Sequence, residues 1–168
     1  MKIILFLSLL IWVIPGFGKV KIQKPRSQHV TAFAIIVDEM TLEKTGGAVE
    51  AYRDALEADG LSTYIVSGNW KNPDEVKAEI IKLNKRKPVL EGVVFIGDIP
   101  VALIRNAQHM TTAFKMNEDE FPFPESSVPS DRFYDDLHLT FDFICQDSVN
   151  TSHFYYKLRE DSPHQLRP

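Results

Sequence analysis

Acidic side chains gather in one short segment of this chain. The twelve residues SSVPSDRFYDDL, at positions 126–137, contain Asp131, Asp135 and Asp136 between a proline-rich stretch and a run of alternating apolar residues. Such carboxylates can coordinate calcium together with backbone carbonyl groups, since that ion accepts about 6 to 8 oxygen ligands. A pair of them can also act as general acid and base. The spacing does not fit an EF-hand, so a calcium site, an acid–base pair and a solvated acidic turn all stay open.

A further acid, Asp98, belongs to the tetrapeptide Gly-Asp-Ile-Pro that begins at Gly97. A glycine followed by an acid at the end of a buried strand allows a sharp turn with the aspartate facing a cleft. Asp98 could therefore orient a catalytic base, bind a cation such as calcium together with Asp131, or cap the next turn. Taken alone, the tetrapeptide favours capping.

Nucleophilic chemistry has little support in the sequence. Cys145 is the only cysteine, and the alternation of the surrounding residues places it on the apolar face with Phe141 and Phe143, opposite His138. We therefore expect a buried, inert thiol and no catalytic residue on this chain. The sequence has no Gly-x-Ser-x-Gly elbow, P-loop or Gly-x-Gly-x-x-Gly motif, which disfavours serine hydrolases and nucleotide binding.

Composition restricts the class of protein further. The 168 residues are 44% hydrophobic and 25% charged, as in an ordinary globular domain, and the formal charge of −4 argues against a nucleic-acid partner. We interpret the basic cluster at 82–87 as the solvated end of a helix. No cofactor is predicted apart from the calcium considered above.

The first eighteen residues have the features of a secretory signal peptide. Lys2 precedes an apolar run, Pro15 ends it, and small residues follow at Gly16 and Gly18. The run is shorter than the about 20 residues that a transmembrane helix needs, so we expect no such helix in the mature chain. The prediction is a signal peptide at 1–18, a single α/β domain at 19–168, and export to the periplasm, the cell surface or the medium.

Apolar runs alternate with amphipathic stretches along the next part of the chain. Strands are predicted at 31–38, 61–68 and 92–98, the last in a central position because it lacks polar alternation. Gly46 and Gly47 should open a first helix that ends at Asp59-Gly60. The pair Asn72-Pro73 should open a second helix with Val76, Ile80 and Leu83 on its buried face.

This order predicts a parallel sheet with helices on both faces, a caspase-like or flavodoxin-like half that is incomplete at its C-terminus. Ligands of such sheets bind at the carboxyl ends of the strands, where Asp38 and Asp98 lie. We expect a functional loop at 105–129, a strand alternating from Leu137 to Cys145, and no complete element in the last fourteen residues. The exposed edge of an incomplete sheet predicts pairing with a partner.

Two segments together resemble the gingipain-type cysteine peptidases, secreted enzymes of the caspase-like class. The first is GVVFIGDIPVA, beginning at Gly92, and the second is VPSDRFYDDL, beginning at Val128. In that family a strand ends in Gly-Asp-Ile-Pro and leads to a Ser-Asp-x-x-Tyr segment. The matching residues here are Gly97, Asp98, Ile99, Pro100, Ser130, Asp131 and Tyr134.

The resemblance, which covers roughly 31–140, implies a peptide or protein substrate and the first half of a peptidase domain. The family's catalytic histidine, in a Gly-His-Gly turn, and its cysteine have no counterpart in these residues. We therefore expect an N-terminal fragment of a secreted cysteine endopeptidase. The alternatives are a secreted non-catalytic module that binds protein, glycan or calcium, and an intracellular flavodoxin-like protein, which the lack of phosphate-binding glycines disfavours.

Overall fold

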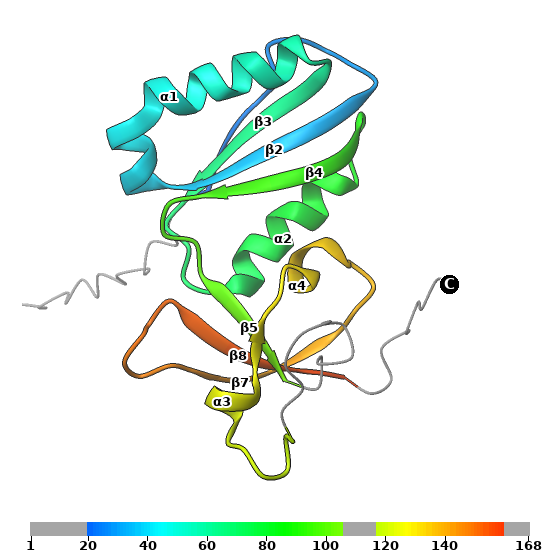
Figure 1. Cartoon of the computed structure of the whole chain (residues 1–168). Coiled ribbons are helices and arrows are strands. Elements are labelled where there is room, and N and C mark those ends of the chain that lie inside the picture. Colours follow the sequence, from blue (N-terminus) through cyan, green and yellow to red (C-terminus); the bar gives the residue numbers. More distant parts are fainter. Residues whose placement is uncertain (1–19, 106–116, 160–168) are drawn as a thin grey trace, which may run out of the picture.

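The computed structural model describes residues 20–105 and 117–159, which form two four-stranded mixed sheets with four helices (Figure 1). The strand order of the first sheet is β1-β3-β2-β4, and that of the second is β6-β5-β8-β7. The elements of the first part of the chain are β1 (Lys21–Gln23), β2 (Thr31–Asp38), α1 (Glu39–Ala58), β3 (Leu61–Gly68), α2 (Pro73–Asn84) and β4 (Val89–Ile96). Those of the second part are β5 (Val101–Arg105), α3 (Phe123–Ser126), β6 (Val128–Pro129), α4 (Arg132–Asp135), β7 (Phe141–Gln146) and β8 (His153–Leu158).

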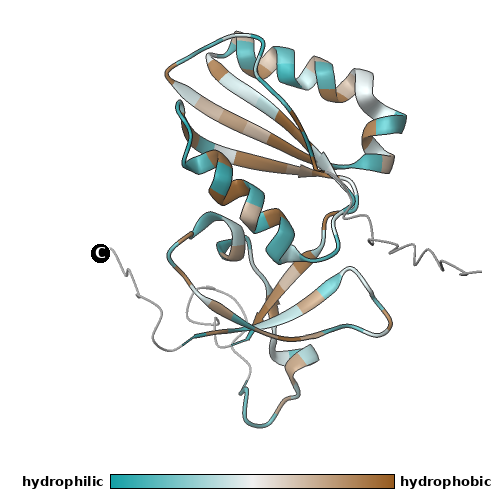
Figure 2. Cartoon of the chain, turned by 180° about the vertical axis from the view of Figure 1, so that it is seen from behind, coloured by the Kyte–Doolittle hydropathy of each residue, from teal (hydrophilic) through white to brown (hydrophobic). Residues whose placement is uncertain are grey.

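The first sheet has a helix on each face, as its sequence predicts. On β2, Ile35 and Val37 pack in one apolar cluster with Val49 of α1. Ala34 and Ile36 point the other way, into the cluster that contains the buried face of α2. In Figure 2 the strands of this sheet are largely brown, whereas both helices alternate between teal and brown. A strand covered on both faces must be apolar throughout, which explains the continuous run at 31–38.

The sheet is only partly parallel. β2 is parallel to both β3 and β4, with Ile35 opposite Ile65 and Val94. The short strand β1, which is not among the predicted strands, pairs antiparallel with the outer edge of β3. Three residues with alternating exposure give too short a pattern for a sequence-based assignment.

The third predicted strand is not central. β4 covers Val89–Ile96 and lies at the end of the strand order, paired only with β2 among the described residues. Its side chains nevertheless contact both apolar clusters, Val94 and Ile96 on the side of α1 and Val93 and Phe95 on the side of α2. The lack of polar residues at alternate positions of β4 therefore reflects burial of both faces of the sheet. It does not indicate that the strand is paired along both of its edges. Among the described residues, the other edge of β4 has no strand partner.

Helix α1 begins at Glu39, before the Gly46-Gly47 pair that was expected to open it. Its N-cap is Asp38, whose carboxylate accepts a hydrogen bond of 2.9 Å from the backbone N–H of Thr41. The Gly46-Gly47 pair lies inside the helix, where Tyr52 is 40% exposed. The predicted helix end is confirmed, with Asp59 as C-cap and a positive φ of 94° at Gly60.

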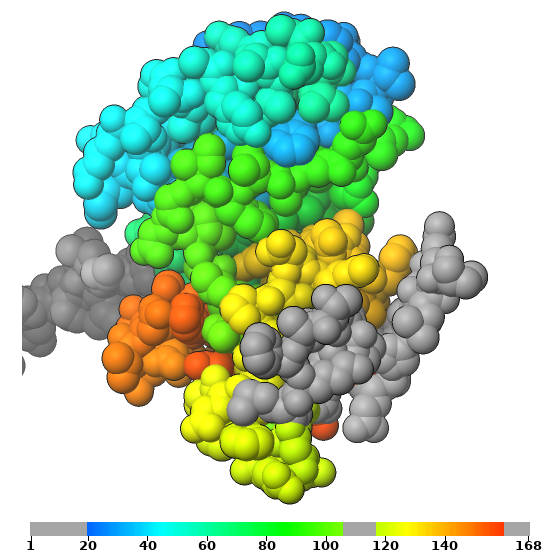
Figure 3. All heavy atoms as spheres, viewed as in Figure 1, coloured from blue at the N-terminus to red at the C-terminus, as the bar shows by residue number. Residues whose placement is uncertain are grey.

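Helix α2 agrees with its prediction at its start and on its buried face. Asn72 Oδ1 accepts a hydrogen bond of 2.9 Å from the Glu75 N–H, and Pro73 occupies the first turn. Val76, Ile80 and Leu83 are buried in a cluster that also holds Phe154, Tyr156 and Leu158 of the second sheet. The helix therefore lies between the two sheets, which pack as two adjoining bodies (Figure 3).

The second sheet corrects two expectations about the later part of the chain. The stretch expected to be one long loop, 105–129, begins at the last residue of β5 and contains α3 and β6, while 106–116 lie outside the described residues. The final residues contain β8, which pairs parallel with β5 and antiparallel with β7. Because β8 joins strands from two different parts of the chain, its role depends on long-range pairing that no local pattern encodes.

The alternating run at 137–145 does not form one regular strand. β7 begins only at Phe141, and its register against β8 shifts at a bulge between Phe143 and Cys145. Phe143 is opposite Tyr156, whereas Cys145 is opposite Tyr155, so Cys145 lies on the other face from Phe143. Phe143 is also 57% exposed and Cys145 is only half-buried. The prediction of a buried cysteine on the phenylalanine face is therefore wrong, because one inserted residue reverses the alternation.

The segment interpreted as a signal peptide, 1–18, lies outside the described residues. Within the residues that are described, no helix combines the length and the apolar character required to cross a membrane.

Candidate functional site

A pocket of about 340 Å³ opens where the three parallel strands of the first sheet end. It lies at the carboxyl edge, the place where the topology predicts a ligand site. Of the described residues that line it, four are acids and none is a serine, cysteine or histidine. The lining residues are Asp38, Glu39, Met40, Glu43, Asn69, Trp70 and Asp98.

The Asp38 carboxylate is occupied by the backbone around it. One oxygen caps α1 at Thr41, and the other accepts a hydrogen bond of 2.8 Å from the Asp98 N–H. Burial alone would raise the pKa of Asp38, but hydrogen bonds from the side chain of Thr41 and from the backbone N–H groups of Thr41, Asp98 and Met40 outweigh it and lower the pKa. Asp38 is therefore a fixed anion that joins the end of β2 to the end of β4.

Gly97 makes this approach possible. Its φ of +89° is a left-handed conformation that side chains disfavour, and a Cβ there would lie 1.9 Å from Asp38 Oδ2. The glycine of the Gly-Asp-Ile-Pro turn is thus required for conformation and for space. After this turn the chain leaves the first sheet and enters β5 of the second (Figure 1).

Asp98 does not cap the turn, although the tetrapeptide favoured that interpretation. Its backbone N–H donates a hydrogen bond to Asp38. Its exposed side chain lines the pocket and has no hydrogen-bond or ion-pair partner among the described residues. Glu39 pairs with Lys21 at 3.1 Å. The pocket is therefore negatively charged and suited to a cationic group, with Asp98 as a free carboxylate at its rim.

The structure does not bring Asp98 together with the other predicted acids at one pocket. Asp135 and Asp136 line a separate, shallow pocket with Arg132 and His138. Asp131 is the residue before α4, and its backbone carbonyl accepts hydrogen bonds from the N–H groups at 134 and 135. Asp136 accepts a hydrogen bond of 3.2 Å from the His138 N–H. The acidic segment is a short helical turn at the surface with local hydrogen bonds.

Across 20–105 and 117–159, no group of three or more His, Cys, Asp and Glu side chains is arranged to hold a metal ion. The predicted calcium ligands Asp98 and Asp131 thus have no such group around them in the described part of the chain.

A polar cluster that sequence reasoning missed lies between α2 and the second sheet. The Tyr156 hydroxyl donates to Asp74 at 2.6 Å, and Lys77 Nζ donates to the Leu139 carbonyl at 3.2 Å, 4.8 Å from the centre of the Phe133 ring. Burial, then the hydrogen bond to Asp74, raises the pKa of Tyr156. Burial lowers the pKa of Lys77 in spite of the nearby aspartates. Asp74 and Lys77 are three residues apart beside the apolar face of α2, which is the one sequence signal that could have indicated this contact.

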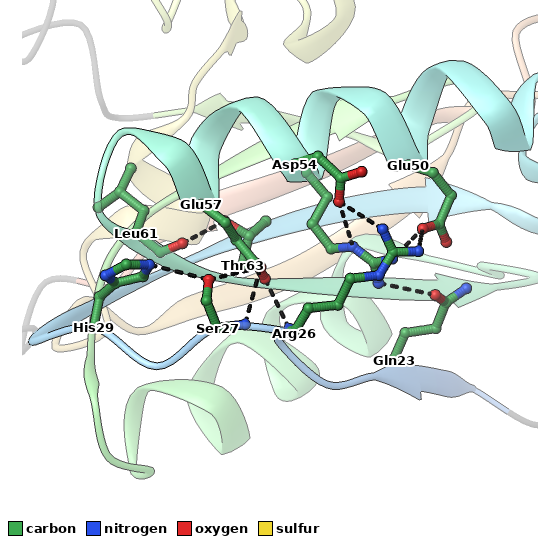
Figure 4. A network of polar contacts seen from close by, with 10 residues as sticks. Gln23, Arg26, Ser27, His29, Glu50, Asp54, Glu57, Leu61 and Thr63 are labelled. Atoms are coloured by element: carbon green, nitrogen blue, oxygen red, sulfur yellow. Dashed lines mark hydrogen bonds and ion pairs between the residues drawn. The ribbon is translucent and has the colours of Figure 1, made fainter.

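A second polar network missed from the sequence fixes the segment between β1 and β2 onto α1 (Figure 4). Glu57 accepts hydrogen bonds from the backbone N–H groups of Arg26 and Ser27, at 2.9 and 3.0 Å, and from the Ser27 hydroxyl at 2.7 Å. Burial would raise the pKa of Glu57, but these bonds outweigh it and lower the pKa. Nearby, the buried Arg53 pairs with Glu50, which also pairs with Arg26.

Comparison of the chain with protein-family models, with curated proteins and with solved structures gave no significant match.

Proposed function

We propose that this chain forms the first half of a secreted, gingipain-type cysteine peptidase domain of the caspase-like class. The observation that carries the proposal is the contact between the two segments on which the resemblance rests. They are separated by some thirty residues of sequence, and each alone is a weak motif. If the chain shares the fold of this family, the two segments should contact each other.

The contact is direct and buried. The Tyr134 hydroxyl donates a hydrogen bond of 2.5 Å to the Pro100 carbonyl, and the Tyr134 ring lies 4.8 Å from the ring of Phe95. The Ser130 N–H donates to the Ala102 carbonyl at 3.2 Å. The Ser-Asp-x-x-Tyr segment thus packs against the Gly-Asp-Ile-Pro turn and the strand that follows it.

In this proposal the chain supplies the scaffold, and the catalytic pair comes from polypeptide outside these 168 residues. A thiolate activated by a nearby histidine would attack the peptide carbonyl, and backbone N–H groups would hold the oxyanion. Cys145 does not fill the role of the nucleophile, because it stands on β7 opposite Tyr155 and the sequence around it lacks the family's motif. Export would follow from the signal peptide at 1–18.

The test is the intact mass of the native protein made by its own cell, together with labelling by an electrophilic peptide probe for cysteine peptidases. We expect a mass well above 19.2 kDa and a labelled cysteine outside the present sequence. A secreted product near the mass of this chain without its first eighteen residues, with no labelling, would contradict the proposal. That result would favour the alternative, a secreted binding module.

A further inference from the structure

A second pocket, of about 510 Å³, opens at the opposite end of the first sheet from the carboxyl-edge pocket. It is formed by the segment before β2, the start of β3 and the segment before β4, which lie at the same end of the sheet because the three strands are parallel (Figure 1). Its volume is within the range of small-molecule sites, about 300–1,000 Å³. The lining residues are Lys24, Pro25, Gln28, His29, Val30, Ser62, Tyr64, Arg86, Lys87 and Pro88.

The lining is basic and includes no acid among the described residues, although the chain as a whole carries a formal charge of −4. Lys24, Arg86 and Lys87 make no ion pair or side-chain hydrogen bond within the described residues, whereas Arg26 close by makes two ion pairs. Three cations without counter-charges at one pocket repel one another, and an anion would relieve that repulsion. The charge pattern therefore indicates an anionic ligand.

The body of the pocket is suited to more than a bare ion. Tyr64 lines it although only 7% of the residue is exposed, and its hydroxyl has no hydrogen-bond partner in the described part of the chain. Pro25 and Pro88 add apolar surface on either side. A lining that combines cations, a tyrosine hydroxyl without a partner and two prolines suits a ligand that has both a charged group and a body.

The pocket wall is held in place before any ligand arrives. Glu57 fixes Arg26 and Ser27, and the Ser27 hydroxyl gives its hydrogen to Glu57 (Figure 4). That hydroxyl therefore accepts from His29 Nε2, 3.0 Å away, while the His29 N–H donates to Ser62 Oγ at 2.7 Å. The network orients the imidazole of His29, so binding would not have to order this side chain.

We propose that this pocket binds a phosphate or sulfate ester carried by a ligand of about the size of a sugar. Arg86, Lys87 and Lys24 bind the oxyanion, and Tyr64 contacts the body of the ligand. A confined, half-enclosed pocket favours a small ligand over a nucleic-acid backbone, which would need a basic surface extending beyond it. The proposal is independent of the peptidase assignment, because the pocket lies at the other end of the sheet from the Gly-Asp-Ile-Pro turn.

Isothermal titration calorimetry of the full chain with glucose 6-phosphate and glucose 6-sulfate tests this proposal, with glucose and inorganic phosphate at matched ionic strength as comparison ligands. We expect saturable 1:1 binding of at least one ester, weaker binding of phosphate and none of glucose. Arg86→Gln and Lys87→Gln should each weaken ester binding about tenfold, the loss expected for a charge-assisted contact. Tyr64→Phe should weaken it about threefold while leaving the charge of the pocket unchanged.

The matched control is Lys44→Gln, which removes the same charge from an exposed position on α1 outside this pocket. It should leave ester affinity unchanged. The absence of saturable binding of either ester would overturn the proposal, as would an equal loss of affinity in Lys44→Gln and Lys87→Gln. If inorganic phosphate bound as tightly as the esters, the proposed contact between Tyr64 and the body of the ligand would be wrong.

Discussion

The Asp38 carboxylate accepts a hydrogen bond from the backbone N–H of Asp98, 60 residues further along the chain. The same carboxylate caps α1, so one side chain fixes the ends of two parallel strands and the start of a helix. This contact explains why the turn after β4 begins with glycine. It also shows that the acid best placed by topology for ligand binding is used to build the edge of the pocket.

Gly97→Ala should destabilise the protein strongly. Alanine would have to adopt a φ near +89° with its Cβ 1.9 Å from Asp38 Oδ2, so the carboxylate must move and give up the hydrogen bond of this oxygen to the Asp98 N–H. We expect a loss of about 2–4 kcal/mol in the free energy of unfolding, measured by urea denaturation. Gly46→Ala is the matched control, because it lies inside α1 with nothing within 4 Å of its added Cβ. It should be neutral or stabilising by up to about 1 kcal/mol, and equal effects of the two variants would contradict this account.

Tyr134→Phe tests the contact between the two segments that carry the resemblance. The substitution keeps the ring against Phe95 and Phe133 but leaves the buried Pro100 carbonyl without its donor. We expect a loss of about 1–3 kcal/mol, the usual cost of a buried unsatisfied group, from thermal or urea unfolding. Tyr52→Phe, at an exposed site on α1, should change stability by less than about 0.5 kcal/mol. A neutral Tyr134→Phe would show that the hydroxyl does not hold the turn.

Local signals predicted the first sheet well because there the local and long-range requirements coincide. The runs at 31–38 and 61–68 match β2 and β3 in full, and Asn72-Pro73 marks the start of α2. The start of α1 was misplaced because a glycine pair is a strong local breaker, whereas the cap at Asp38 also depends on its contact with the distant turn at Asp98. Helix propensity was overridden by tertiary contacts.

The second sheet could not be predicted in the same way. The bulge in β7 reverses the face of Cys145 without any change in the apolar–polar pattern that a reader of the sequence would notice. At the candidate site, the sequence indicated the carboxyl edge and the acids Asp38 and Asp98. It could not show that Asp38 is already bonded, because that depends on the pairing of β2 with β4 and on the turn at Gly97. It also could not show that Asp135 and Asp136 line a different pocket, because that depends on where the later part of the chain folds.

Calcium should not stabilise this chain. Within the described residues no acidic group has the arrangement of a metal site, and Asp131 stands apart from Asp98 at a separate surface turn. We expect the melting temperature to stay within about 1 °C when 5 mM calcium replaces a chelator at constant ionic strength, because an ion that does not bind the folded state does not stabilise it. Asp131→Ala should give the same response as the unchanged chain. A rise of several degrees that Asp131→Ala abolishes would restore the calcium-binding module as the leading alternative.

Cys145 should be dispensable. The sequence around Cys145 lacks the motif of the peptidase family. The thiol is half-buried, and Cys145 lies opposite Tyr155 in the strand pairing. The purified chain should therefore show no hydrolysis of fluorogenic peptides above the buffer rate, and Cys145→Ser should leave both this result and the fold unchanged. Hydrolysis that disappears in Cys145→Ser would show that the nucleophile is on this chain after all.

The carboxylate of Glu57 should give the protein part of its resistance to acid. Its pKa is lowered in the folded state, because three hydrogen bonds to the segment before β2 favour the ionised form. A carboxyl group of this kind contributes stability that is fully present above its unfolded-state pKa, ordinarily near 4.5, and is lost as the pH falls through the lower folded-state value. Glu57→Gln replaces one acceptor oxygen by an NH₂ group that faces N–H donors. It should lower the free energy of unfolding by about 2 kcal/mol at pH 7.

The informative quantity is the difference in unfolding free energy between the unchanged chain and Glu57→Gln from pH 7 to pH 3. We expect that difference to stay constant down to about pH 5 and then to shrink, since only the unchanged chain loses the ionised carboxylate. Glu43→Gln is the control, because Glu43 is exposed on α1 outside the Glu57 network. Its difference should stay near zero throughout. If the Glu57→Gln difference instead grew in acid, the carboxyl would be protonated in the fold, and the network that shapes the basic pocket would have to be redrawn.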